Sequence, residues 1–457
     1  MKAIFILLTV LFVVISFALS KRVKTGKDLL VPAEGLPFVI VAFTMAASQF
    51  GSSMLIGGVQ QAAEQEIGEG FWPAIYTLIA ASASCFLNVL IAPRFRNMDG
   101  TVTPPEFIEF RYGHSCFLRG YHSVVYICSV TAILISQIVG FAGMGHAFGF
   151  SYESSAIFCT IVICLMAMGS GMIGVAVTDA IQYVLIILLL CGTIPVSLNA
   201  LRKVGITFGE LVREPFFSSG DQKARFFYTA WPMIIGNLFS YEYFMRFMSC
   251  KGLKEAKKAS LLAGIFLLIA ALPVALLGAV ANACYQNVAA DEVFGMILKN
   301  ELPPTIRILL MAAVLMAILT SADSMLTSVS GMISRDLYAG LILKNKPVTE
   351  VRNFRFIIKV SIVVVAAVAA ICALHFTQIL QITFFFSPLT SGVMFAPMII
   401  GLFWKKASRK GAVLSVITGA MAALLHITGI VTLFDRVAGP ALVGSVALIV
   451  FSLLFPD

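Results

Sequence analysis

The stretch LPFVIVAFTMAASQFGSSMLIGGVQQA, residues 36–62, decides the fold expected for this chain. It is long and apolar enough to cross a bilayer as a helix, yet Ser48, Gln49 and Gly51 interrupt its middle. A membrane helix can unwind at depth only where protein or water satisfies the freed backbone groups. The stretch therefore predicts a discontinuous helix that faces a polar interior.

A second interrupted span, FFYTAWPMIIGNLFSYEYFMRF at 226–247, carries Pro232, Gly236 and Asn237 near its middle. Counted from residue 36, the two interrupted segments are the first and the sixth spans. Transporters built from inverted repeats bind substrate and coupling ion at matched discontinuous helices near the bilayer midplane. Close helix packing by small residues is the alternative explanation for the glycines. The matched pair favours a transporter.

Composition indicates an integral membrane protein. The 457 residues are 59% hydrophobic and 12% charged, with a mean hydropathy of +0.96, which excludes an ordinary soluble globular protein. Apolar runs recur along the chain and predict about thirteen transmembrane helices. The expected spans are 3–20, 37–61, 72–92, 121–147, 155–173, 177–200, 227–248, 259–284, 305–330, 357–375, 378–404, 411–430 and 439–455.

The basic residues lie in alternate loops, as membrane insertion requires and a nucleic-acid-binding face does not. Placing the loop after 3–20 in the cytoplasm puts most of the 32 Lys and Arg residues on that side. We therefore expect a multi-pass protein of the plasma (inner) membrane, with its N-terminus outside and its C-terminus cytoplasmic. It is expected to bind no nucleic acid and to function as a monomer in the lipid bilayer.

The chain shows no pattern typical of an enzyme. Its nine cysteines form no Cys-x-x-Cys pair, and its five histidines have no metal-ligand spacing. No Ser/His/Asp arrangement or catalytic carboxylate pair is evident in the sequence. We expect neither catalysis nor a structural metal.

Residues 316–338, MAILTSADSMLTSVSGMISRDLY, place hydroxyls and a carboxylate in a membrane span. An intramembrane carboxylate such as Asp323 costs at least ~2.5 kcal/mol by insertion scales unless it is paired or faces a wet cavity. Sodium, a small hard cation, prefers oxygen ligands, and hydroxyls with unwound carbonyls are neutral oxygen ligands. The stretch predicts a cation site.

Several motifs resemble those of the sodium:solute symporter family. GSGMIGVAVTDAIQ at 169–182 resembles its Gly-rich Thr-Asp-x-x-Gln motif, and 316–338 resembles its Ser/Thr-rich ninth span. Further similarities follow in the family's order, at VKTGKDLLV (23–31), TPPEFIEFRYG (103–113), MRFMSCKGLKEAKKAS (245–260) and GLFWKKASRKGA (401–412). The resemblance covers nearly the full chain.

The resemblance implies an all-α LeuT-type fold. Residues 1–20 would form a leading helix, and 36–404 would form a ten-helix transport core. Within the core, 36–200 and 226–404 would be inverted five-helix repeats. Residues 411–457 would add two trailing helices.

The resemblance also implies a first sodium site between the broken second span and the ninth span. Its ligands would be three backbone carbonyls and two hydroxyls, those of Ala47, Phe50, Ala317, Thr320 and Ser321. A second cation or proton site in some members implies a role here for Asp179, Asp323 and Ser324. Since Asp323 replaces the hydroxyl of the two-sodium pattern, the sodium stoichiometry stays open, as does whether Asp323 binds sodium, a proton or neither.

The substrate pocket should lie beside the ion site, where amides, hydroxyls and aromatic rings suit a small polar solute. The candidates are Gln49, Ser53, Gln60, Trp72, Tyr76, Asn237, Ser240 and Tyr241, each of which could instead bridge helices. Glu242 is expected to pair with Arg246 four residues later. The run Phe384, Phe385 and Phe386 could form an outer gate or face lipid and core.

These features predict secondary active symport. Inward sodium flow would drive import of a small polar organic solute by alternating access, since one charge crossing 100 mV releases ~2.3 kcal/mol. Proton-coupled or sodium-independent transport within the same fold is the alternative, and a transporter-derived solute sensor is another. The sequence leaves the solute itself open.

Overall fold

The computed structural model describes residues 35–96, 103–169, 172–213, 220–344, 353–376, 378–431 and 435–457, with a few isolated positions elsewhere. This described part is helical, as expected, and one isolated β-bridge joins Leu36 to Cys250 within it. The expected leading helix at 1–20 falls almost wholly outside the described residues.

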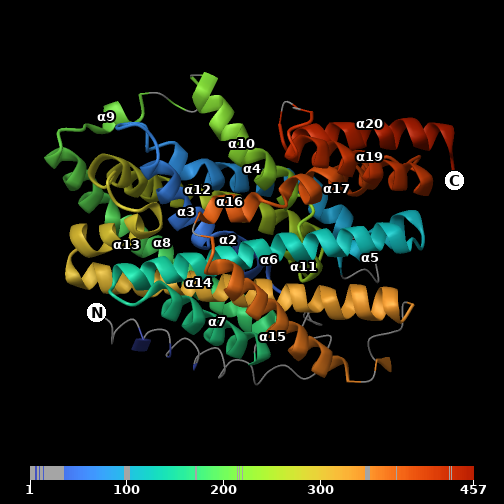
Figure 1. Ribbon diagram of the computed structural model, residues 1–457, viewed down its shortest axis with the longest axis horizontal. Helices are drawn as coiled ribbons and strands as arrows, with labels where there is room; N and C mark the ends of the chain where they lie inside the picture. Colours follow the sequence, from blue (N-terminus) through green and yellow to red (C-terminus); the bar gives the residue numbers. More distant parts are fainter. Residues whose placement is uncertain are drawn as a thin grey trace.

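The helices run mostly along the long axis of the molecule (Figure 1). The α-helices are α2 (Phe38–Gln49), α3 (Ser52–Ala63), α4 (Tyr76–Arg96), α5 (Pro104–Tyr112), α6 (Cys116–Ala147), α7 (Tyr152–Gly169), α8 (Met172–Lys203), α9 (Phe208–Leu211), α10 (Gly220–Asn237), α11 (Tyr241–Met248), α12 (Leu253–Cys284), α13 (Ala290–Glu301), α14 (Pro304–Met332), α15 (Phe354–Ala373), α16 (Ile379–Phe384), α17 (Val393–Phe395), α18 (Gly401–Phe403), α19 (Arg409–Ile427) and α20 (Ala438–Leu454). The other helical segments are a 3₁₀ turn, η1 (Pro73–Ile75), and three π-helical stretches, η2 (Ile333–Ile342), η4 (Pro388–Gly392) and η5 (Ala396–Ile400).

Every expected span from 37–61 onward coincides with a helix or an interrupted helix. Among the described residues, eight helices are long and apolar enough to cross a membrane, or nine if α2 and α3 count as one bent span. The bend between α2 and α3 is 42°. α7 and α20 are also apolar but are shorter than these spans.

The last span of the expected core, 378–404, is not a regular helix. Pro388 has no N–H, so the carbonyl of Phe384 loses its helical partner. The hydroxyl of Ser387 takes that place and donates to the Phe384 carbonyl at 2.6 Å. The π-helical stretches η4 and η5 follow in the same span, and each includes a proline near its start. Prolines therefore explain why this span is irregular.

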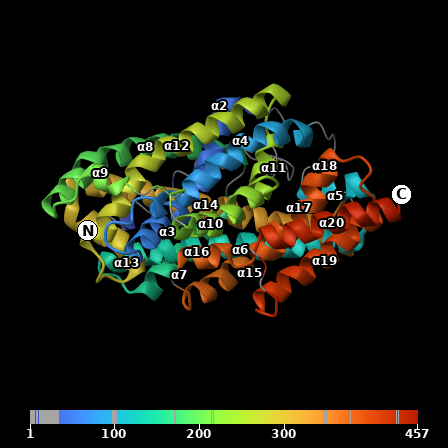
Figure 2. The same ribbon diagram turned by 90° about the horizontal axis from the view of Figure 1, so that it is seen from above.

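Two groups of helices enclose the centre of the molecule. α12 packs against α2, α3, α4 and α8, whereas α14 packs against α6, α7, α8 and α15. The α19–α20 pair packs together at one flank, on the side away from α8 and α12 (Figure 2). The discontinuous pair α2–α3 contacts both α12 and α14, and the short helix α11 packs against α2 and α4.

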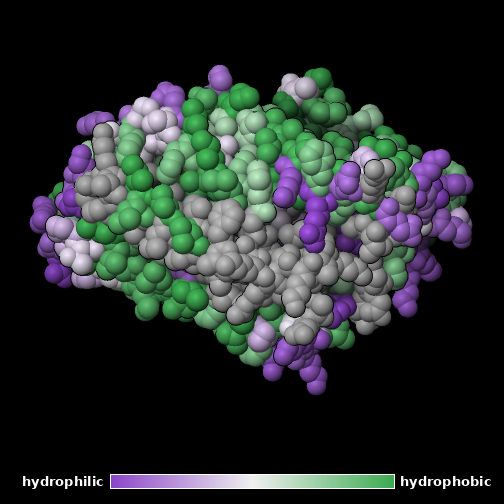
Figure 3. Space-filling view, turned by 90° about the horizontal axis from the view of Figure 1, so that it is seen from below, coloured by the Kyte–Doolittle hydropathy of each residue, from purple (hydrophilic) through white to green (hydrophobic). Residues whose placement is uncertain are grey.

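The surface matches a bilayer environment. On the face shown in Figure 3, hydrophobic residues form broad areas between the ends of the long axis, and hydrophilic residues are most frequent towards those ends. Large exposed apolar side chains on α15 and α20 include Val364, Ile371, Val446 and Leu453. Such a belt faces lipid without cost, because the bilayer interior is itself apolar.

Candidate functional site

The first predicted break lies at Phe50 and Gly51. The N–H of Phe50 still bonds to the carbonyl of Ala46 at 3.0 Å, but Gly51 is extended, with φ −99° and ψ −158°. The amide of Gln137 on α6 fills the gap, and its Oε1 accepts a hydrogen bond from the N–H of Ser52 at 2.9 Å. A side chain from a neighbouring helix thus caps α3 inside the protein, as an interrupted membrane helix requires.

Gly51 is needed because Gln137 lies so close. A Cβ at position 51 would meet Oε1 and Nε2 of Gln137 at 2.7 and 2.8 Å. Ser52 holds the same pair of helices from its other side, since its hydroxyl donates to the Ser136 carbonyl at 2.8 Å. The sequence did not identify Gln137 as a functional residue. Its amide within the apolar run ILISQIVGF was the signal that could have indicated it.

The second predicted break separates α10 from α11. Ser240 caps α11, and its Oγ accepts a hydrogen bond from the N–H of Tyr243 at 3.3 Å. Asn237, at the end of α10, donates from Nδ2 to Oε1 of Gln49 and to Oγ of Ser84, both at 3.3 Å. The two broken helices therefore contact each other directly at their breaks.

A cavity of about 80 Å³ lies between these breaks. Five of the expected pocket residues line it, and these are Gln49, Ser53, Asn237, Ser240 and Tyr241. Residues from α6 and from the 378–404 span complete the wall, among them Tyr126, Ser129, Gln137, Thr383, Ser387, Thr390 and Ser391. Hydroxyls and amides dominate the polar part of this lining.

A second cavity, of about 170 Å³, lies towards the α3 end of the molecule and includes Gln60 in its wall. Phe384 lines both cavities and is 6% exposed. Phe385 is 66% exposed and lines neither. Glu64, which follows α3, also lines the second cavity, and burial raises the pKa of its carboxyl above the usual value.

Trp72 and Tyr76 lie away from both cavities. The ring of Trp72 packs edge-on against Phe71, with centroids 5.3 Å apart. The hydroxyl of Tyr76 donates to Oε1 of Gln222 and joins α4 to the start of α10. In this conformation Tyr76 bridges two helices, which is the alternative that the sequence left open.

The five residues proposed for the first sodium site are all buried. Ala47 and Phe50 lie at the end of α2, and α14, which carries Ala317, packs against both α2 and α3. The hydroxyl of Thr320 donates to the Met316 carbonyl at 3.0 Å, one turn earlier.

Ser321, next along α14, differs from Thr320. Its Oγ is buried, and no hydrogen-bond partner for it exists among the described residues. A buried hydroxyl without a partner is costly. The group is therefore available to a ligand.

Asp179 joins three helices. Its Oδ2 accepts a hydrogen bond from the Thr44 hydroxyl at 2.7 Å and lies 3.9 Å from Nη2 of Arg246 on α11. Asp323 is equally buried, at 2% exposed, and Ser324 is half-buried. α8 packs against α14, so the helices that carry these three residues are neighbours.

The carboxylate of Glu242 does not form the expected ion pair. Nη1 of Arg246 donates instead to the backbone carbonyl of Glu242 at 3.2 Å. The Arg246 side chain reaches towards Asp179 on another helix. The spacing of four residues between Glu242 and Arg246 therefore did not predict the ion pair correctly. Glu242 lines the central cavity.

A model of the sodium:solute symporter family matches residues 32–419. The chain belongs to this family. Among similar proteins, the osmoregulated proline transporter OpuE of Bacillus subtilis is 26% identical over 89% of this chain and 85% of its own length. The sodium/pantothenate symporter of Haemophilus influenzae is 24% identical over 91% and 87%, and the human high affinity choline transporter 1 is 22% identical over 89% and 71%.

Solved structures show the same LeuT-like fold. A Na⁺-coupled sialic acid symporter in a substrate-bound outward-open state has a TM-score of 0.80 and 18% identity, covering 100% of this chain and 98% of that one. Mhp1, a nucleobase-cation-symport-1 transporter in a closed conformation, has a TM-score of 0.58 and 12% identity, with 94% of each chain covered. The family to which the chain belongs consists of transporters and not of enzymes.

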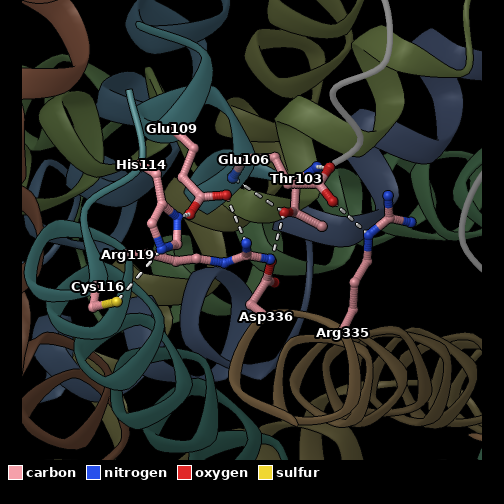
Figure 4. Close-up of polar contacts among 8 residues, drawn as sticks. All are labelled: Thr103, Glu106, Glu109, His114, Cys116, Arg119, Arg335 and Asp336. Carbon is pink, nitrogen blue, oxygen red and sulfur yellow. Dashed lines mark hydrogen bonds and ion pairs between the residues drawn. The ribbon is translucent and has the colours of Figure 1, made fainter. Parts of the chain in front are cut away.

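An ionic network joins α5, α6 and η2 of this symporter-family protein (Figure 4). Arg119 on α6 lies 2.6 Å from Oε2 of Glu109 and 3.3 Å from Oδ1 of Asp336. The hydroxyl of Thr103 also donates to Oδ1 of Asp336, at 2.8 Å. Arg119 and Asp336 are 3% and 0% exposed, so this is a buried ion pair.

The network explains two of the sequence similarities. TPPEFIEFRYG forms α5 together with its Thr103 capping box, and SRDLY forms the start of η2. Nε of Arg335 donates to Oε1 of Glu106 at 2.8 Å and adds a second bridge between these segments. The sequence did not predict this contact, because more than 200 residues separate its partners.

Proposed function

We propose that this protein is a sodium-coupled secondary active symporter that imports a small polar organic solute by alternating access. The central cavity between the two broken helices carries the proposal, because it combines polar walls with helix ends that unwind inside the protein. Family membership supports sodium as the coupling ion. The pantothenate and choline transporters among the relatives are named for small polar solutes.

The first sodium site is proposed at the carbonyls of Ala47, Phe50 and Ala317 and the hydroxyls of Thr320 and Ser321. The break after Phe50 supports it, since carbonyls near a helix end have fewer helical partners. The Ala47 carbonyl shares the Phe50 N–H with the Ala46 carbonyl, at 3.1 Å and 3.0 Å. The unpartnered Ser321 hydroxyl supports it further. Neutral oxygen ligands bind sodium without trapping it.

A second cation or proton site is proposed at Asp179, Asp323 and Ser324. Asp179 would exchange its contact with Arg246 for the ion. Asp179→Asn and Asp323→Asn should then change the Hill coefficient for sodium or the pH profile of uptake. An unchanged response in both variants would remove this site.

The solute is proposed to bind in the central cavity, at Gln49, Ser53, Asn237, Ser240 and Tyr241. Phe384 would close the passage to the second cavity, which includes Gln60 and would face the outside. Trp72 and Tyr76, which line neither cavity in this conformation, would change position as α10 moves. The proposed topology has the N-terminus outside and the C-terminus in the cytoplasm.

The LeuT-like fold of similar structures supports the proposed repeats and trailing helices. Residues 36–200 and 226–404 would be inverted repeats, and 411–457 would form the trailing pair. About thirteen helices would cross the inner membrane, and one chain would suffice for transport. Cross-linking in the membrane would test the last point.

Uptake by reconstituted protein tests the proposed function. Proteoliposomes should accumulate at least one solute of a polar panel when an inward sodium gradient is imposed. Replacing external sodium by choline or lithium should abolish accumulation. Binding of a solute without accumulation would contradict transport and favour a sensor.

A further inference from the structure

The central cavity has one charged group in its described lining, the carboxylate of Glu242. Glu242 lies in the first turn of α11, directly after the break that Ser240 caps. It is 6% exposed, so it is more than nine-tenths buried. Its Oε1 is buried and has no hydrogen-bond partner among the described residues.

A carboxylate in this position needs a cation. Transferring an ionised group from water to a protein interior is costly unless it is paired and hydrogen-bonded. The charge of Arg246, one turn along the helix, acts on this carboxylate, but the guanidinium makes its direct contacts with the Glu242 carbonyl and the Asp179 carboxylate. No Lys, Arg or His is among the described residues that line the cavity.

The neighbouring hydroxyls do not replace a cation. Tyr126, which also lines the cavity, donates its hydroxyl hydrogen to the Phe239 carbonyl at 2.8 Å. The Tyr241 hydroxyl is buried without a hydrogen-bond partner in the described part. The rings of both tyrosines can face a cation favourably, because the face of an aromatic ring carries negative charge.

We propose that Glu242 selects the solute by binding its protonated amine. This inference rests on the proposed symport and adds a substrate class to it. The unpaired oxygen can accept a hydrogen bond from an N–H or an O–H donor, but a positively charged N–H donor forms the stronger bond with a carboxylate. A primary or secondary ammonium therefore fits better than an analogue with a hydroxyl or an ether oxygen in its place. The side-chain amides of Gln49 and Asn237, which line the same cavity, would bind the other polar groups of the solute.

The cavity also limits solute size. At about 10–15 Å³ for each water-sized group, its volume takes a solute of roughly five to eight non-hydrogen atoms. Small amino acids and amino alcohols fall in this range. Each has a close analogue without the amine, which makes the charge testable.

The test is a thermal-shift titration of the full chain in sodium chloride with three matched pairs. The pairs are alanine and lactate, proline and tetrahydrofuran-2-carboxylate, and 3-aminopropan-1-ol and propane-1,3-diol. In each pair a hydroxyl or an ether oxygen replaces the amine. The ammonium member of at least one pair should bind at least about tenfold more tightly than its partner.

Glu242→Gln should remove this preference, and Glu242→Asp should retain part of it. Glu153→Gln is the matched control, since Glu153 also follows a tyrosine at the start of a helix but is exposed. It should keep the full preference. Stabilisation by sodium alone should persist in every variant and shows that each is folded.

Three results of this titration would overturn the inference. They are tighter binding by the members without an amine, an unchanged preference in Glu242→Gln, and no binding by any member of the panel. Sodium-driven uptake of a solute without an amine would also overturn it while leaving symport intact. Amine binding that needs Glu242 but gives no sodium-driven accumulation would instead contradict the proposed symport.

Discussion

The hydroxyl of Thr44 donates a hydrogen bond to Oδ2 of Asp179 at 2.7 Å and joins α2 to α8 across the buried centre of the protein. Thr44→Val keeps the shape of the side chain but leaves the carboxylate without this donor. Losing one partner of a buried hydrogen bond costs about 1–3 kcal/mol, so the variant should unfold at a lower temperature. Thermal unfolding in detergent measures this.

Thr160→Val is the matched control for that variant. The Thr160 hydroxyl donates to the Ala156 carbonyl within its own helix, at 2.8 Å, and joins no second helix. Equal loss of stability in the two variants would show that the hydrogen bond between α2 and α8 stabilises the protein no more than one within a single helix.

Removing the Ser321 hydroxyl should affect sodium binding more than folding. Ser321→Ala deletes a buried group that lacks a partner, so stability without sodium should stay the same or rise. Stabilisation by sodium should fall, because binding to the folded state is what stabilises it. Thr320→Ala should lose sodium stabilisation as well.

Ser330→Ala, on the same helix, is the control for both. The Ser330 hydroxyl bonds to the Leu326 carbonyl at 2.7 Å, one turn earlier. Its variant should keep the wild-type response to sodium. If Thr320→Ala and Ser321→Ala keep it too, the first sodium site is misplaced.

Gly51→Ala should damage the first helix break. The new methyl would collide with the Gln137 amide, and overpacking of this kind costs about 1–3 kcal/mol. Uptake should fall with stability, because Gln137 both caps α3 and lines the cavity. Gly192→Ala, on α8, has nothing within 4 Å of its new Cβ and should be neutral or slightly stabilising.

Breaking the pair of Arg119 and Asp336 should be worse than removing both. Asp336→Leu leaves a buried guanidinium with less compensation, and breaking a buried pair costs about 3–5 kcal/mol. The double variant Arg119→Leu/Asp336→Leu should recover part of that loss in thermal unfolding. Arg119→Leu alone completes the comparison. If the loss of stability in the double variant equals the sum of the losses in the two single variants, the two charges do not interact.

Local composition was enough to predict the helical fold and both breaks. Polar residues and glycines in apolar runs marked the break at Phe50 and Gly51, and Pro232 with Asn237 marked the second. The family resemblance predicted the LeuT-like fold, because its motifs kept their order along the chain. These signals are local in sequence, and helix breaks are local structures.

The partners of the buried charges could not be predicted in the same way. Spacing favoured Arg246 as the partner of Glu242, but the fold brings Asp179 to Arg246 from a distant helix. Likewise, contact between Thr103 and Asp336 depends on packing between segments far apart in sequence. Trp72 and Tyr76 were suitable pocket residues by type, and packing alone decides which cavity a side chain lines.

Solute-stimulated uptake of radioactive sodium into proteoliposomes tests sodium-coupled symport most directly. The wild-type protein should carry sodium inward together with a bound solute, and Thr320→Ala/Ser321→Ala should reduce both fluxes at least about tenfold. Solute entry without any accompanying sodium, at a rate that the double variant leaves unchanged, would contradict the account.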